Sequence, residues 1–73
     1  MENLVSGMIL VEKDFGDLHW LVITPEGWKA IDTGACCIEF EPSNYTKAYI
    51  PKDYNDPWTP ADGTEIMLTE AEQ

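Results

Sequence analysis

The sequence predicts a small, mainly all-β domain. Its apolar residues come in short runs rather than at helical spacing, and these runs are rich in Val, Ile, Trp, Tyr and Phe. Turn signals separate the runs at intervals of about eight to twelve residues. This pattern is typical of a small antiparallel meander or an SH3-like barrel, because both are built from short strands joined by tight turns. The 73 residues leave room for one domain.

The first three predicted strands form a meander. Residues 6–13 and 18–24 flank a polar turn, residues 14–17, in which Gly16 stands where a positive φ is wanted. A Pro-Glu-Gly sequence then supplies proline at the second position of a turn and glycine where a type II turn needs φ > 0. It leads into a third strand at residues 28–32.

The fourth and fifth predicted strands, residues 36–41 and 45–50, alternate between two faces. In the fourth strand the core side is expected to hold Cys36, Ile38 and Phe40, and the solvent side Cys37, Glu39 and Glu41. In the fifth strand Thr46, Ala48 and Ile50 alternate with Tyr45, Lys47 and Tyr49, and the second set is expected on the non-core face.

The composition changes at Pro51, which divides the chain into a β domain, residues 1–51, and an acidic arm, residues 52–73. From residue 53 onward there are six acids and no basic residue, and two prolines interrupt any regular pattern. We expect the arm to be flexible and partly disordered, since it has few apolar residues to offset the entropy of ordering. Residues 64–68 are the exception and predict an edge strand or an apolar anchor.

Aromatic residues are abundant for such a short chain. We expect the core to take Trp20, Trp28 and Phe40, because aromatic side chains bury the most area per residue. Tyr45 and Tyr49 share the face expected to be exposed. With Glu39 and Glu41 on a neighbouring strand they would form an aromatic anchor ringed by acid.

The charge is one-sided: fourteen Asp and Glu stand against four Lys and no Arg, for a net charge of -10. Such an excess repels nucleic acids and anionic membranes, and the chain lacks the guanidinium fork that binds phosphate. We therefore expect a protein partner with a basic surface and no direct contact with nucleic acid or membrane. The partner-binding candidates are Asp14, Asp17, Glu39, Glu41, Tyr45 and Tyr49.

No catalytic, cofactor or metal site is predicted. Zinc sites need four ligands at spacings such as Cys-x-x-Cys, whereas this chain has the adjacent pair Cys36 and Cys37 and the single His19. Residues 53–56 resemble the start of a calcium loop, but Pro57 occupies the next ligand position. The sequence therefore predicts a binding protein rather than an enzyme.

The N-terminal sequence has no cationic region, and the longest apolar run, residues 8–11, is too short for a signal sequence or a membrane span. Adjacent cysteines provide no disulfide framework of the kind found in small secreted domains. We expect a soluble, cytoplasmic chain that is monomeric when free.

Short, acidic, mostly β chains resemble phage-encoded host-takeover proteins, among them the small regulators that bind bacterial RNA polymerase. The matching features are the hairpin of residues 7–11 with residues 18–23 and the acidic segment after Pro51, and the likeness is one of size and charge over the whole chain. It implies binding near the nucleic-acid or promoter-specificity surfaces of the polymerase in the host cytoplasm. The implied effect is inhibition of promoter-dependent initiation, antitermination, or both. It carries over no binding residue.

Acidic DNA mimics that inhibit a host nuclease, a restriction enzyme or a CRISPR system are similar to the chain in the same respects. They form the alternative hypothesis.

Overall fold

The computed structural model describes residues 4–68. These residues form one six-stranded antiparallel sheet, in the order β4-β3-β2-β1-β5-β8, and a separate hairpin of β6 and β7. The elements are β1 (Ile9–Glu12), β2 (Leu18–Thr24), β3 (Gly27–Ile31), β4 (Cys37–Glu39), the 3-10 turn η1 (Pro42–Asn44), β5 (Tyr45–Tyr49), β6 (Pro51–Asp53), β7 (Asp56–Pro60) and β8 (Ile66–Met67). The predicted all-β class is confirmed.

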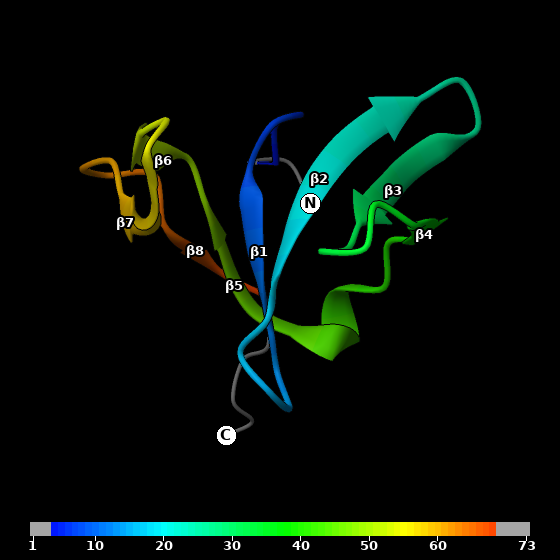
Figure 1. The fold of residues 1–73 in the computed structure, drawn as a ribbon. Coiled ribbons are helices and arrows are strands. Elements are labelled where there is room, and N and C mark those ends of the chain that lie inside the picture. Colours follow the sequence, from blue (N-terminus) through cyan, green and yellow to red (C-terminus); the bar gives the residue numbers. More distant parts are fainter. Residues whose placement is uncertain (1–3, 69–73) are drawn as a thin grey trace.

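Strands β1 to β3 form the predicted meander, β4 continues it, and β5 pairs with the other side of β1. Figure 1 shows β2 and β3 leaning to one side of the molecule, and β5, β8 and the β6–β7 hairpin to the other. Strands β4 and β8 are the two edges of the sheet within residues 4–68. Of the two predicted architectures, the described sheet is therefore the open meander, extended by two strands, and not a closed barrel.

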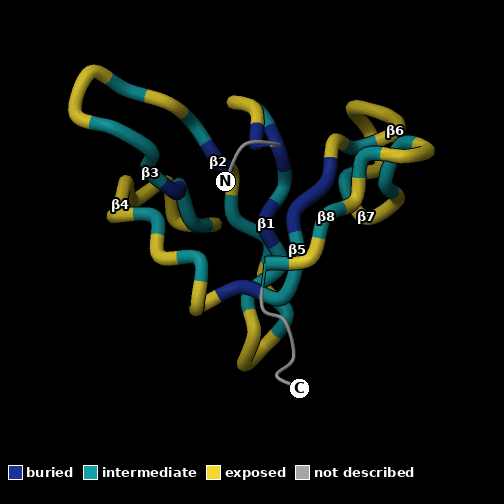
Figure 2. Tube along the Cα trace, turned by 180° about the vertical axis from the view of Figure 1, so that it is seen from behind, coloured by how far each residue is buried: buried dark blue, intermediate teal, exposed yellow. Residues whose placement is uncertain are grey.

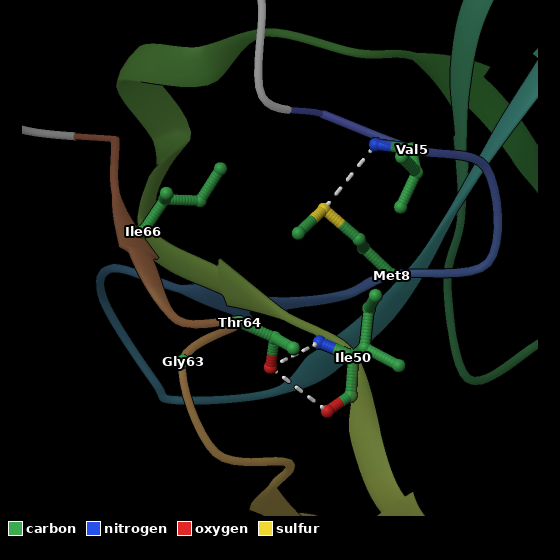
Figure 3. Close-up of a pocket in the computed structure, with 6 residues that line it drawn as sticks. All are labelled: Val5, Met8, Ile50, Gly63, Thr64 and Ile66. Atoms are coloured by element: carbon green, nitrogen blue, oxygen red, sulfur yellow. Dashed lines mark hydrogen bonds between the residues drawn. The ribbon is translucent and has the colours of Figure 1, made fainter.

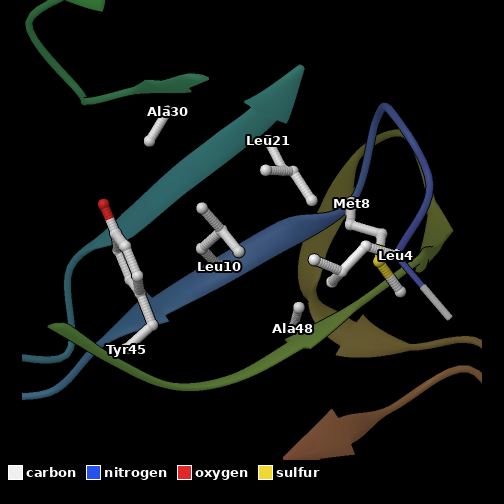
Figure 4. Packing of buried hydrophobic residues seen from close by; sticks show 7 residues of the cluster. All are labelled: Leu4, Met8, Leu10, Leu21, Ala30, Tyr45 and Ala48. Carbon is white, nitrogen blue, oxygen red and sulfur yellow. The ribbon is translucent and has the colours of Figure 1, made fainter. Parts of the chain in front are cut away.

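The core lies on one face of this sheet. Leu10 is paired with Ala48 and Leu21 with Ala30, and all four side chains are fully buried. The buried cluster comprises Leu4, Met8, Leu10, Leu21, Ala30, Tyr45 and Ala48 (Figure 4). Trp28 and Phe40, both predicted for the core, are partly buried and pack against it with Ile66 and Leu68. We call this side the core face and the opposite side the outer face.

Trp20 is not part of the core, contrary to the prediction. It precedes Leu21 on β2, and because successive strand residues point to opposite faces, burial of Leu21 places Trp20 on the outer face. Its side chain is 53% exposed. Strand alternation, rather than aromatic character, decides the position of this side chain.

Tyr45 was expected outside and is buried, with 1% of its surface exposed. A β-bulge is the reason: Val11 pairs with Lys47, but Glu12 pairs with Tyr45, so Thr46 is an extra residue on β5. The extra residue turns Tyr45 to the core face. There its ring stacks on Phe40 with a centroid distance of 5.8 Å.

Tyr49 is buried for a different reason. It lies on the outer face as predicted, opposite Ile9 of β1, but the β6–β7 hairpin covers it. Its hydroxyl donates a hydrogen bond of 2.5 Å to the carbonyl oxygen of Pro57 on β7. The predicted aromatic anchor of Tyr45 and Tyr49 is therefore corrected, since neither side chain reaches the surface.

The segment after Pro51 is built into the fold as far as residue 68. The 64–68 segment supplies the predicted edge strand, β8, which pairs with β5 through Ala48 and Ile66. The amide of Leu68 also donates to the carbonyl of Thr46 at 2.9 Å. This packing differs from the loose arm expected for residues 52–73. Residues 69–73, the last part of the arm that was expected to be flexible, lie outside the described residues.

Burial is concentrated in the middle strands of the sheet. Figure 2 shows the buried stretches along β1 and β5 in the middle of the molecule, and exposed stretches at the turns and in the β6–β7 hairpin. The exposed parts include several large apolar side chains, among them Phe15, Trp20, Tyr54 and Trp58. Residues available for recognition are therefore found at the periphery of a thin core.

Candidate partner-binding surface

Acidic side chains occupy the surface. None of the Asp and Glu residues between positions 4 and 68 is buried, and only Glu12 and Asp32 are half-buried. Two of the four lysines are neutralised locally, because Lys29 pairs with Glu39 and Lys47 with Glu65. The hydrogen bond to Glu39 also raises the pKa of Lys29. Within residues 4–68, most of the carboxylates therefore form no ion pair with a lysine.

The β1–β2 turn displays two of the predicted acids, Asp14 and Asp17, beside Phe15, which is 83% exposed. The turn is ordered by the Glu12 carboxylate, which accepts a hydrogen bond of 3.0 Å from the amide of Phe15. Gly16 adopts the predicted positive φ, 73°. The carboxylates are thus presented by a hydrogen-bonded turn with an apolar tip.

The other two predicted acids, Glu39 and Glu41, follow each other along β4 and just beyond it, and both are exposed. Glu39 is engaged by Lys29, which leaves Glu41 as the more available carboxylate. The amide of Lys13 donates to the carbonyl of Asn44 at 2.8 Å, so the β1–β2 turn is held against the segment that follows Glu41. Of the six predicted residues, Asp14, Asp17 and Glu41 are the acids that remain unpaired by lysine at this end of the molecule.

The outer face carries an apolar groove that the sequence reasoning missed. A cross-strand row of Ile9, Trp20 and Ile31 runs over β1, β2 and β3. Two adjoining hollows of about 310 and 320 Å³ lie along this row, and both are lined by Ile9, Trp20 and Pro57. We call the combined feature the Trp20 groove. Its remaining lining residues are Gly7, Leu18, His19, Ile31, Asp32, Thr33, Pro51 and Tyr54.

A signal for this groove exists in the sequence. Strand β2 has Leu18, Trp20 and Val22 on the face opposite Leu21, so both faces of the strand are apolar. A strand that is apolar on both sides is covered on both sides or offers one side to a partner. Because Trp20 was expected in the core, the apolar character of the outer face of β2 was not recognised.

Carboxylates border the Trp20 groove. Asp32 lines one hollow, and Asp53 and Asp56 face each other across the β6–β7 hairpin next to Tyr54, which is 94% exposed. Like charges directly opposite each other on paired strands destabilise the pair. The exposed Lys52 is the one lysine in this hairpin, so its local charge remains negative.

A hollow separate from the Trp20 groove, of about 420 Å³, opens beside β5 and is drawn in Figure 3. Its polar groups are satisfied internally: the amide of Ile50 donates to Thr64 Oγ1, and that hydroxyl donates to the carbonyl of Ala61 at 2.8 Å. The rest of its lining is mainly aliphatic, including Val5, Met8 and Ile66. None of the described residues that line this hollow has a titratable side chain.

The reactive side chains are dispersed. His19 Nδ1 lies 2.8 Å from the hydroxyl of Tyr45, in an edge-to-face contact, so the imidazole serves the packing of the core. Cys36, expected to face the core, directly precedes the edge strand β4 and is exposed like Cys37. Between residues 4 and 68, no three His, Cys, Asp or Glu side chains are grouped so that they could hold a metal ion.

That same part of the chain has no helix with the length and hydropathy needed to cross a bilayer.

Comparison with known proteins adds no relative: no protein-family model matches the chain, and neither the curated proteins nor the solved structures give a match. The functional argument therefore depends on the residues described above.

Proposed function

We propose that this protein is a non-enzymatic regulator that binds a basic surface of another protein, and that bacterial RNA polymerase is the first target to test. The observation that carries the proposal is the unneutralised acid on the surface. Two of the four lysines already pair with acids, and no Asp or Glu between residues 4 and 68 is buried. A partner of opposite charge provides the missing counter-charge.

The exposed aromatic side chains support binding rather than catalysis. Trp and Tyr are enriched among the residues that contribute most to protein interfaces. Here Trp20 and Tyr54 border one groove, and Phe15 stands between Asp14 and Asp17 at the tip of a turn. Exposed aromatic side chains therefore lie close to exposed carboxylates on the same surface.

The mechanism proposed is occupation of a surface. Long-range attraction guides the acidic chain to a basic region of the polymerase, and the aromatic residues then bury apolar area at close range. A basic region that normally holds nucleic acid or a promoter-specificity contact would be unavailable while the chain is bound. Reduced promoter-dependent initiation, or read-through of terminators, would follow from that competition.

The proposal is tested with purified bacterial RNA polymerase and immobilised protein at low and high salt. Surface charges are screened over about 8 Å at physiological ionic strength, so added salt is expected to reduce mainly the association rate. A promoter-dependent transcription assay with a terminator downstream reports the effect on initiation and read-through. Binding that is indifferent to salt, or no binding to polymerase, contradicts the proposal, and inhibition of a nuclease instead favours the DNA-mimic alternative.

A matched pair of variants asks whether the predicted acids act locally. Asp14→Asn with Asp17→Asn removes two charges from the β1–β2 turn, and Glu26→Gln with Asp62→Asn removes two exposed charges elsewhere. We expect the first variant to associate more slowly than the second. Equal rates would assign the effect to net charge alone.

A further inference from the structure

We infer that the Trp20 groove receives an apolar side chain from an extended, lysine- or arginine-bearing segment of the partner. This inference rests on the proposed function and deepens it, because it names the docking site and the chemistry of the docking segment. The acids of the β1–β2 turn would attract the partner, and the groove would hold it.

The shape of the groove supports a single side chain as the occupant. Each hollow is near the lower end of the roughly 300–1,000 Å³ typical of ligand pockets, which suits a side chain of a peptide rather than a folded surface. Ile9 is shared by both hollows, with the ring of Trp20 and the ring of Pro57 beside it. An inserted aromatic or branched aliphatic group would therefore find apolar contact on several sides.

The groove is also held in place before a partner arrives. Pro57 is fixed by the hydrogen bond from Tyr49, and Pro51 pairs across the hairpin with Pro60. Proline has a restricted backbone, so this wall loses little freedom when a ligand binds. Trp20 lies on a strand paired on both sides, by β1 and by β3.

Charge complementarity specifies the segment that carries the apolar group. Asp53 and Asp56 oppose each other beside Tyr54, which lines one hollow, and Asp32 lines the other hollow. The Asp53 carboxylate accepts from the amide of Asn55 at 3.0 Å, and the Asp56 carboxylate accepts from the hydroxyl of Thr59 at 2.6 Å. These neutral donors leave the repulsion between the carboxylates in place, whereas a lysine or arginine flanking the inserted side chain would reduce it.

The test uses three synthetic heptapeptides with blocked ends and the intact protein labelled with ¹⁵N. One peptide has a central Phe between two pairs of Lys, the second replaces Phe by Gly, and the third replaces the four Lys by Gln. We expect the first peptide to shift the indole N–H signal of Trp20. We expect both other peptides to bind at least about tenfold more weakly than the first. The indole signals of Trp28 and Trp58 serve as internal references.

Matched variants locate the site. Trp20→Ala removes a groove residue, whereas Trp58→Ala removes an equally large, 65% exposed side chain that lines neither hollow. Tyr54→Ala gives a second groove variant whose side chain is 94% exposed and contributes little to folding. We expect Trp20→Ala and Tyr54→Ala to weaken binding of the Phe-containing peptide at least fivefold, and Trp58→Ala to leave it unchanged.

Two double variants test the contribution of charge near the groove. Asp53→Asn with Asp56→Asn is expected to weaken the same peptide several-fold more than Glu26→Gln with Asp62→Asn does. Equal affinity for the Lys and Gln peptides, or equal effects of the two double variants, would overturn the basic character of the segment.

The outcomes separate the groove from the proposed target. Polymerase binding that survives Trp20→Ala and Tyr54→Ala would overturn the inference and leave the proposed function standing. Peptide binding at Trp20 without any binding to polymerase would support the groove and contradict the proposed target. Absence of a Trp20 shift at millimolar concentrations of the Phe-containing peptide would overturn the inference directly.

Discussion

The hydroxyl of Tyr49 donates a hydrogen bond of 2.5 Å to the carbonyl oxygen of Pro57 and thereby fastens the β6–β7 hairpin to the outer face of β5. One side of Pro57 then borders the Trp20 groove. Through this contact the acidic C-terminal segment provides a wall of the candidate binding site.

Replacement of Tyr49 by Phe tests that contact. We expect the free energy of unfolding to fall by about 1 kcal/mol, because the hydroxyl donor is lost and the carbonyl of Pro57 is left without it. Hydrogen exchange should accelerate in the β6–β7 hairpin more than in β1 or β2. Tyr54→Phe is the control, since that side chain is exposed, and an equal loss of stability in both variants would contradict the role of the hydrogen bond.

The stability of the protein should decrease in alkaline solution. Burial raises the pKa of Tyr45 and of Tyr49, and nearby carboxylates raise both further. Above about pH 10 the unfolded chain therefore releases tyrosine protons before the folded chain does, so the free energy of unfolding declines as pH rises through the folded pKa values.

Urea unfolding between pH 8 and pH 11, with tyrosinate absorbance as the titration signal, measures this decline. The double variant Tyr45→Phe with Tyr49→Phe should show a shallower decline. The raised pKa of Lys29 acts in the same direction, and both chains retain it. Equal slopes for the two chains would contradict the prediction.

Truncation of two neighbours on β2 should reduce stability by very different amounts. Leu21→Ala removes a fully buried side chain and is expected to cost about 2–5 kcal/mol, which is comparable with the total stability of a domain of this size. Trp20→Ala removes an exposed side chain and is expected to cost less than about 1 kcal/mol. Thermal melts followed by circular dichroism compare the stability of the two variants. If the Trp20 variant is unfolded, Trp20 contributes to the core and the prediction is wrong.

The β3–β4 turn should be stabilised by exchanging two residues. Ala35 adopts a φ of 66°, a left-handed conformation that costs a non-glycine residue about 1–2 kcal/mol. An added Cβ at Gly34 would meet Asp32 Oδ1 at 3.5 Å, an ordinary contact. Gly34→Ala with Ala35→Gly leaves the composition unchanged, so we expect a gain of about 1–2 kcal/mol in urea unfolding.

The opposite change, made in the β1–β2 turn, provides the control. Gly16→Ala, at a φ of 73°, should destabilise the protein by about 1 kcal/mol. A loss of stability in the exchanged variant would show that Ala35 is not under strain.

Local patterns in the sequence were sufficient to predict much of the fold. The strands β2 and β3, the glycine of the β1–β2 turn and the edge strand at residues 64–68 follow from apolar runs and turn chemistry within a few residues. The position of Tyr45 does not follow from them, because a single extra residue at Thr46 reverses the period and leaves no compositional mark. Burial of Tyr49 likewise depends on a hairpin that returns from later in the chain.

The candidate site shows the same division. Exposure of Asp14, Asp17, Glu39 and Glu41 was predictable, since an ionised carboxylate is costly to bury. The Trp20 groove was not predicted, because it forms only when β1, β2, β3 and the β6–β7 hairpin come together. Local sequence signals identify strands, but they do not state which apolar face of a strand remains without a cover.

The bulge at Thr46 makes the face on which Tyr45 lies depend on the number of residues between Tyr45 and Lys47. Insertion of one further residue beside Thr46 would reverse the alternation and turn Tyr45 away from Phe40, so the core would lose its largest side chain, whereas deletion of Thr46 would leave Tyr45 opposite Glu12 on the core face. The exposed β1–β2 turn can take insertions at far lower cost. Natural variation in chain length should therefore gather at residues 13–16 and avoid residues 45–49, even where the side chains concerned face solvent.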